Sequence, residues 1–220
     1  MDKFSNGINT ILWDWNGTLL NDVEVCVASM NTLLSRRNIR PLSLDKYRSI
    51  FRFPVESYYN EAGIDLNAEP FDRLASEYME LYHENIRRAP LHAEARFVLD
   101  ILKSSGFRQY LISAMEHRSL VQMLRERELD GFFDRIHGIE DHYAVSKLDS
   151  AVKLASENRI DMGNTCLIGD TDHDKEVADA LGCRCILIAS GHQARERLEA
   201  VNSQVASSLT ELYSLLGIKD

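Results

Sequence analysis

The sequence predicts an α/β protein in which a doubly wound parallel sheet carries an inserted all-helical domain. Two patterns support this class. Short apolar segments recur along the chain and alternate with segments of helical periodicity, an order typical of a parallel sheet covered on both faces. One long interval near the N-terminus has helical periodicity throughout and shows no strand pattern. The 220 residues suffice for one large core and a smaller second domain.

Five short apolar segments predict the strands of the sheet. They occupy residues 8–14, 107–113, 134–138, 164–170 and 183–189. Helical patterns lie between and after them, at residues 93–105, 117–128, 147–159, 174–181, 193–201 and 209–216. Because a parallel strand can follow another only through a crossover connection, this alternation predicts a Rossmann-like sheet with helices on both faces.

The interval of residues 20–89 predicts a separate helical domain. It begins with the pattern NDVEVCVASMNTLLSRR and ends with the amphipathic pattern AEPFDRLASEYMELYHENIRR, which stops before Pro90. We therefore expect a core domain formed by residues 1–19 and 90–220, with residues 20–89 inserted as a helical cap. The expected hinges are residues 19–21 and 89–92.

The charge balance disfavours one class of partner. The chain has 25 Lys and Arg against 34 Asp and Glu, a formal net charge of -9, whereas binding to a nucleic-acid backbone needs a basic face. The sequence has neither an apolar run of the roughly 20 residues that cross a bilayer nor the apolar segment of a signal peptide at its start. We therefore expect a cytoplasmic protein without nucleic-acid or membrane partners. The chain has four cysteines, Cys26, Cys166, Cys183 and Cys185. The apolar stretch LGCRCILIAS predicts that Cys183 and Cys185 are buried thiols rather than a metal or redox site.

Three of the predicted strands end in polar side chains. These residues are Asp14, Ser113 and Asp170. In parallel α/β sheets, ligands bind beyond the carboxyl ends of the strands, so residues at three such ends meet at one edge. Alone, each is most often a helix cap or a turn residue. Together they predict a site at the carboxyl edge of the sheet.

The residues around Asp14 resemble those of a known family. The segment ILWDWNGTLLND resembles the first motif, hhhDxDGTL, of the haloacid dehalogenase (HAD) superfamily, whose nucleophilic aspartate corresponds to Asp14. The other three motifs resemble, in order, Ser113 in YLISA, Lys147 in AVSKLDSA, and Asp170 and Asp174 in GDTDHD. The helical insertion lies between the first and second motifs, as in the helical-cap branch of the family. The chain is most similar to phosphoglycolate-phosphatase-like members.

The resemblance implies a Mg²⁺-dependent phosphatase that hydrolyses a small phosphorylated metabolite through an aspartyl-phosphate on Asp14. Because a phosphate dianion repels a carboxylate nucleophile, the cation has to offset that repulsion. The implied metal ligands are the carboxylates of Asp14, Asp170 and Asp174 and the backbone carbonyl of Asn16. The implied phosphate contacts are Ser113, Gly17, Thr18 and Ala114, with Lys147 neutralising both the nucleophile and the phosphate.

Position 16 departs from the family pattern. The family has a second aspartate there, which protonates the leaving group and then deprotonates the attacking water, whereas this chain has Asn16. An amide cannot exchange a proton in this way, and losing such acid–base help costs about 10²–10⁴-fold in rate. We expect one of three outcomes: a phosphatase that is slow or favours good leaving groups such as acyl or aryl phosphates, an aspartyl-phosphate that persists, or a phosphate-binding protein of low turnover.

Two other reactions stay open. A phosphonatase lacks the second aspartate but needs a lysine in the cap, and Lys46 is the only lysine between residues 20 and 89. Its surroundings, SLDKYRSI, are typical of an exposed helix. A phosphotransferase is the other alternative, with the same aspartyl-phosphate passed to an acceptor other than water.

The cap loop at residues 49–59, SIFRFPVESYY, contains the expected substrate contact Arg52. Its guanidinium is suited to a carboxylate or a second phosphate, although it is equally suited to stack on the neighbouring aromatic rings. Further candidates for substrate contacts are His192, Glu116 and His117. Phosphoglycolate is the substrate that the resemblance suggests. We expect a monomer or a weak homodimer.

Overall fold

Six parallel strands form one sheet. The computed structural model describes residues 5–139 and 147–218, and within them the strand order is β3-β2-β1-β4-β5-β6. Each neighbouring pair is parallel. The strands are β1 (Thr10–Trp13), β2 (Arg108–Glu116), β3 (Arg135–Ile139), β4 (Thr165–Gly169), β5 (Arg184–Ile188) and β6 (Gln204–Ala206). The predicted α/β class with a parallel sheet is therefore confirmed.

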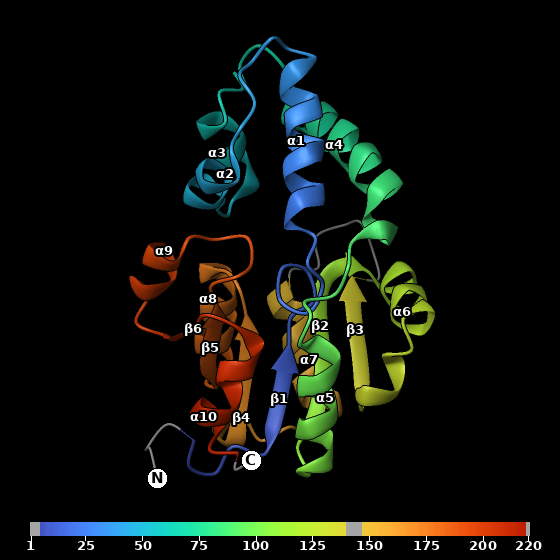
Figure 1. Ribbon diagram of the computed structural model, residues 1–220, viewed down its shortest axis with the longest axis vertical. Coiled ribbons are helices and arrows are strands. Elements are labelled where there is room, and N and C mark those ends of the chain that lie inside the picture. The colour runs from blue at the N-terminus through green and yellow to red at the C-terminus, as the bar shows by residue number, and fades with distance from the viewer. Residues whose placement is uncertain (1–4, 140–146, 219–220) are drawn as a thin grey trace.

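Helices connect the strands, and a further group of helices lies beyond the carboxyl ends of the strands (Figure 1). The α-helices of the core are α5 (Ala95–Ser104), α6 (His117–Glu126), α7 (Lys147–Glu157), α8 (Asp172–Leu181), α9 (Arg195–Glu199) and α10 (Leu212–Leu216). The short 3₁₀ helices of the core are η2 (Asp130–Phe132), η3 (Met162–Asn164) and η4 (Leu209–Glu211). The cap helices are α1 (Val23–Ser35), α2 (Leu44–Ile50), α3 (Val55–Glu61), α4 (Phe71–Asn85) and η1 (Ile86–Arg88).

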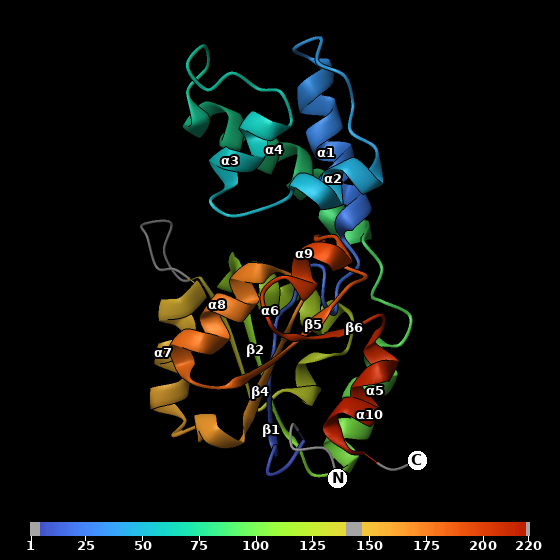
Figure 2. The same ribbon diagram turned by 90° about the vertical axis from the view of Figure 1, so that its left-hand side faces the viewer.

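Successive residues of each strand face opposite sides of the sheet, as the period of two in a strand requires. In β1, Ile11 and Trp13 belong to an apolar cluster with α5, α6 and α10, whereas Leu12 belongs to a second cluster with α7 and α8. Figure 2 shows the strands between these two groups of helices. The sheet is therefore covered on both faces, and this explains why its central strand is a continuous apolar run rather than an alternating one.

The chain passes between the core and the cap helices along two adjacent segments. Leu20 forms an antiparallel bridge with Leu91, the Asn21 N–H donates to Pro90 O at 2.9 Å, and the His92 N–H donates to Leu19 O at 3.0 Å. The expected hinges thus pair with each other. The domain limits at residues 20 and 89 stay a prediction, and the outermost parts of the core domain, residues 1–4 and 219–220, lie outside the described residues.

Three elements differ from the prediction. The strand expected to end at Ser113 continues to Glu116, because β3 resumes pairing with it after a shift in register. The helix expected at residues 193–201 is shortened to α9, because the Gln193 side chain accepts from the Asp172 N–H at 2.7 Å and Ala194 has an extended backbone. The strand β6 was not expected, since three residues give too short an apolar signal.

The described cysteines are all free thiols. Cys26, Cys166 and Cys185 are buried and Cys183 is partly buried, which for Cys183 and Cys185 agrees with the prediction of buried thiols. Among residues 5–139 and 147–218, the helices are too short or too polar to cross a membrane.

Adding a side chain at Gly138 should destabilise the fold, because the backbone of residues 115–117 lies close to this position. A Cβ atom at this position of β3 would lie 2.5 Å from Met115 O and 2.8 Å from the His117 Cα. We expect Gly138→Ala to lower the free energy of unfolding by about 1–3 kcal/mol, because backbone atoms cannot move aside cheaply. Gly131→Ala is the control, since a Cβ there meets no atom within 4 Å. Equal urea midpoints for the two variants would contradict this packing.

Candidate active site

Three carboxylates meet at the carboxyl edge of the sheet. Asp14 follows β1 and Asp170 follows β4, and these two strands are neighbours at the point where the strand order reverses. Asp174 belongs to the first turn of α8. One oxygen from each carboxylate lies within 4.8 Å of the others, and all three residues are buried. The structure thus brings together the first and last of the sequence motifs.

Lys147 joins this cluster from the first position of α7. Its ammonium contacts Asp14 Oδ1 and Asp174 Oδ1. The lysine is almost fully enclosed, with 9% of its side chain exposed. The sequence predicted a lysine opening a helix, and the structure places that lysine between two of the carboxylates.

The cluster holds more negative than positive charge. Burial raises the pKa of the Asp14 carboxyl from 3.8 to about 6 and that of Asp170 to about 7. Burial acts in the same direction on Asp174, but the Lys147 ammonium outweighs it and lowers the pKa of that carboxyl. Burial acts to lower the pKa of Lys147, but Asp14 and Asp174 outweigh it and raise that pKa, so the lysine is charged.

These residues fit a divalent cation. Three buried carboxylates and one ammonium leave two negative charges when all are ionised, and hard oxygen ligands are the donors that Mg²⁺ prefers. Asp174 Oδ2 already accepts from Thr171 Oγ1 at 2.7 Å and from the Thr171 N–H at 3.0 Å. Its Oδ1 is therefore the oxygen that faces the shared space with Asp14 and Lys147.

The turn after Asp14 holds the carboxylates in place rather than facing a ligand. Thr18 is fully buried, and its hydroxyl lies 3.0 Å from both Asp14 Oδ2 and Asp170 Oδ1. The Gly17 N–H donates to Leu20 O and to Asp22 Oδ1. Both residues are predicted phosphate contacts, and in this structure their donors have partners within the protein.

Position 17 requires glycine because the Asp170 carboxylate and the His192 ring lie too close for a Cβ atom. It has φ +76°, and a Cβ there would lie 2.3 Å from Asp170 Oδ2 and 2.5 Å from the His192 ring. Any larger residue would push the turn away from the carboxylate cluster.

The side chain of Asn16 is directed toward the cap. Its Nδ2 lies 2.9 Å from Asp22 Oδ2 and 2.7 Å from Tyr82 Oη, and the Tyr82 hydroxyl donates to the same Asp22 oxygen at 2.9 Å. Ser113 is buried and lies on the other side, with its hydroxyl 3.4 Å from Asn16 Oδ1. Its neighbour Ala114 lines the main cavity. Position 16 therefore sits between the predicted phosphate contacts and a network that reaches α4.

A buried ion pair between Asp22 and His192 completes this network. His192 Nε2 lies 3.3 Å from Asp22 Oδ1, and the His192 N–H donates to Asp170 Oδ2 at 2.6 Å. Burial acts to lower the pKa of His192, but Asp22 outweighs it and raises that pKa to about 9; the histidine in turn lowers the pKa of Asp22. Sequence reasoning missed Asp22, whose only signal was a second acidic residue shortly after the GTLL turn.

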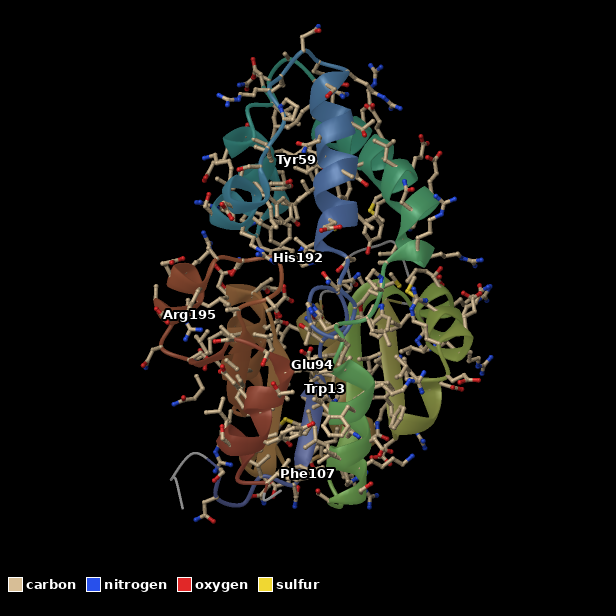
Figure 3. The ribbon with its side chains drawn as sticks, in the orientation of Figure 1. Trp13, Tyr59, Glu94, Phe107, His192 and Arg195 are labelled. Atoms are coloured by element: carbon tan, nitrogen blue, oxygen red, sulfur yellow. The ribbon has the colours of Figure 1, made fainter. Side chains whose placement is uncertain are left out.

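The loop that carries His192 also binds the helix α2. Tyr47 Oη lies 2.9 Å from His192 Nδ1, and the Arg48 guanidinium donates to Ser190 O and Gly191 O. Gln193 Nε2 donates to Phe51 O at 3.1 Å. Figure 3 shows His192 at the junction between the cap helices and the core.

The structure does not bring Arg52 to the carboxylates. Its guanidinium pairs with Glu61 at 2.7 Å, and Arg52 does not line the main cavity, although its neighbours Phe51 and Phe53 do. Glu116 lines the cavity but also accepts from the Arg118 and Ser119 N–H groups at the start of α6. The sequence pattern could not reveal these local partners.

The sequence and the fold were compared with known proteins. The model of the haloacid dehalogenase-like hydrolase family matches residues 11–188. The chain is 25% identical to pyrophosphatase PpaX from Bacillus mycoides over 226 residues, covering 95% of this chain and 97% of that protein. It is also 25% identical to phosphoglycolate phosphatase from Caulobacter vibrioides over 191 residues, covering 83% and 80%.

Solved structures show the same fold. A haloacid dehalogenase-like hydrolase from Streptococcus pneumoniae superposes with a TM-score of 0.80 at 20% identity, covering 94% of this chain and 98% of that one. The Mycobacterium tuberculosis protein tyrosine kinase A has the same TM-score at 19% identity, covering 97% and 100%. The predicted resemblance is thus confirmed by both sequence and fold: the chain belongs to the haloacid dehalogenase-like hydrolase family.

Proposed function

We propose that the protein is a phosphatase that requires a divalent cation, Mg²⁺ by preference, and that releases phosphate through an aspartyl-phosphate on Asp14. The observation that carries this proposal is the buried cluster of Asp14, Asp170, Asp174 and Lys147 at the carboxyl edge of the sheet. Curated relatives named phosphoglycolate phosphatase and pyrophosphatase, aligned over most of the chain, support the same class of reaction.

A divalent cation at this site is held by carboxylate oxygens of Asp14, Asp170 and Asp174, and the Asn16 backbone carbonyl is the further predicted ligand. Such a cation supplies positive charge that offsets the repulsion between a carboxylate and a phosphate dianion. Lys147 contributes a second positive charge, and its contact with Asp14 Oδ1 fixes the orientation of the nucleophile. Thr18 holds the other oxygen of the same carboxylate.

The site supplies a nucleophile, Asp14, but position 16 supplies no acid for the leaving group. An oxygen of Asp14 bonds to phosphorus as the bond to the leaving group breaks. No acid is available from Asn16, whose amide is bound to Asp22 and Tyr82. A leaving group of low basicity departs without protonation, so we expect the enzyme to favour acyl and aryl phosphates over alkyl phosphates.

The alternatives carry less support. Lys46 is exposed and does not line the main cavity, which argues against a phosphonatase that forms a Schiff base from the cap. A tyrosine kinase shares the fold at low sequence identity, so the fold alone does not separate hydrolysis from phosphotransfer.

An assay distinguishes the phosphatase from a phosphate-binding protein of low turnover. Metal-dependent release of phosphate from acetyl phosphate or p-nitrophenyl phosphate supports the enzyme, whereas tight vanadate binding without release supports the binding protein.

Metal binding predicts a thermal shift. We expect saturating Mg²⁺ to raise Tm by about 5 °C, because the cation binds the folded carboxylate cluster and not the unfolded chain. Asp170→Asn should abolish the shift, whereas Asp72→Asn, at an exposed position on α4, should retain it. The measurement is differential scanning fluorimetry with Mg²⁺ and with EDTA. A shift of equal size in the Asp170 variant would place the cation elsewhere.

Substitutions at positions 14 and 16 test the chemistry. Asp14→Asn should eliminate phosphate release. Asn16→Asp should raise turnover of alkyl phosphates by about 10²-fold, because the new carboxyl lies beside Asp22, is favoured in its protonated form and can donate to the leaving oxygen.

Asn16→Ser is the matched control, since it removes the amide without adding an acid. Acetyl phosphate turnover should change little in Asn16→Asp, because acetate needs no proton to leave. Intact-mass measurement before the assay guards against deamidation of Asn16, which precedes Gly17. Unchanged turnover of alkyl phosphates in Asn16→Asp, with Asp14→Asn inactive, would show that position 16 does not limit the reaction.

A further inference from the structure

A cavity of about 750 Å³ adjoins the carboxylate cluster and extends beneath the cap helices. Its core end is lined by Asp14, Lys147 and Asp170. Its cap side is lined largely by aromatic and apolar side chains, among them Phe51, Phe53, Tyr58, Phe71, Tyr78 and Met79. The volume is that of a pocket for a drug-sized ligand and exceeds what a two-carbon phosphate needs. The space beside the phosphate site is therefore large and mainly apolar.

The described lining offers no uncommitted lysine or arginine. Among the described lining residues, the only lysine or arginine is Lys147, and its ammonium is bound to Asp14 and Asp174. The lining has three histidines: His192 is paired with Asp22, His173 is 2.9 Å from Glu176, and the His83 ring lies 6.0 Å from the Tyr82 ring. A substrate carboxylate or a second phosphate normally requires an arginine or lysine partner. The lining thus disfavours both phosphoglycolate and pyrophosphate.

The cap arginines nearest the cavity are engaged elsewhere. Arg52 pairs with Glu61, and the Arg48 guanidinium donates to Ser190 O and Gly191 O. Neither lines the cavity. The described cavity lining therefore contains no arginine.

Two large apolar side chains of the cavity are exposed. Phe53, between α2 and α3, is 42% exposed, and Met79, on α4, is 41% exposed. Apolar side chains that line a cavity and remain accessible gain by contact with an apolar ligand. Tyr58 lines the same cavity, and its buried hydroxyl has no hydrogen-bond partner among the described residues. An occupant with a large apolar body matches these exposed side chains and the aromatic wall that Tyr58 adds.

We propose that the substrate is a phosphate monoester with a bulky apolar leaving group, an aromatic alcohol in particular. This inference rests on the proposed phosphatase function and adds the class of leaving group. The ring system lies among the cap side chains while the phosphate lies at the carboxylates. Asn16 leads to the same class independently, because a phenol, with a pKa of about 10 like tyrosine, leaves as its anion without an acid.

Hydrolysis of an aryl phosphate takes two steps. An Asp14 oxygen forms a bond to phosphorus, and the bond between phosphorus and the aryl oxygen breaks. The electron pair leaves with that oxygen as an aryloxide, which takes its proton from solvent. Water then cleaves the aspartyl-phosphate, giving inorganic phosphate and the free carboxylate of Asp14.

The first experiment compares kcat/KM in Mg²⁺ for 2-naphthyl phosphate, phenyl phosphate, phosphoglycolate and pyrophosphate. The two aryl esters have leaving groups of similar acidity and differ chiefly in apolar area. We expect about a tenfold higher kcat/KM for the naphthyl ester, mainly through KM, since its second ring is buried. Phosphoglycolate and pyrophosphate should rank below phenyl phosphate. A ranking with either of them first would overturn the inference while leaving the phosphatase function intact.

Binding to Asp14→Asn protein tests the substrate class without turnover. With the nucleophile removed, 2-naphthyl phosphate should bind at least about tenfold more tightly than phosphoglycolate, measured by calorimetry in Mg²⁺. Equal or reversed affinities would overturn the inference. If wild-type protein releases no phosphate from acetyl phosphate or from any aryl ester, the proposed function fails, and this binding comparison still decides the ligand class of the cavity.

A third experiment places a positive charge in the cavity lining. Met79→Arg should lower the ratio of kcat/KM for 2-naphthyl phosphate to that for phosphoglycolate by about tenfold, because it adds a cation and removes apolar surface. Val152→Arg is the matched control, since Val152 is an exposed apolar residue on α7 outside the cavity lining. A ratio that changes equally in both variants, or in neither, would overturn the inference.

Discussion

The burial of three carboxylates against a single ammonium is the constraint on which the rest of the site depends. Asp14, Asp170 and Asp174 are each nearly inaccessible, and the Lys147 ammonium contacts Asp14 and Asp174 directly. Like charges in a space of low polarity repel strongly unless a cation or proton intervenes. Burial is the main cause of the raised pKa values of Asp14 and Asp170, and the neighbouring aspartates raise them further. A divalent cation among the three carboxylates would relieve this repulsion.

A second polar network lies directly above the first and connects it to the cap helices. Asp22 accepts from Asn16, Gly17 and Tyr82 and pairs with His192, while the His192 backbone N–H binds Asp170. The residue that replaces the usual acid is thus one member of a buried network rather than an isolated amide. This arrangement explains how the chain accommodates an amide at position 16 without an unsatisfied donor. Four of its members, Asn16, Asp22, Tyr82 and His192, also line the apolar cavity. The amide at position 16 and the apolar lining thus both support the proposed class of leaving group.

Much of the fold was predictable because its signals are local. The strands around Trp13 and Ile168 are apolar runs bounded by turn residues, and the helices between strands have regular apolar spacing. The errors occurred where long-range contacts override local pattern. The strand through Ser113 is prolonged by its partner β3, and the helix after Gln193 begins late because that side chain binds α8 and the cap.

The sequence by itself determined the class of fold, the order of the motifs and the residues of the carboxylate cluster, because each belongs to a short segment with its own signature. Only the tertiary structure decided the direction of the Asn16 amide, the pairing of Asp22 with His192 and the pairing of Arg52 with Glu61. The physical reason is distance along the chain: Asn16 and Tyr82 are 66 positions apart, and nothing local specifies their contact. The same reason hid the apolar character of the cavity, whose walls come from separate elements that meet only after folding.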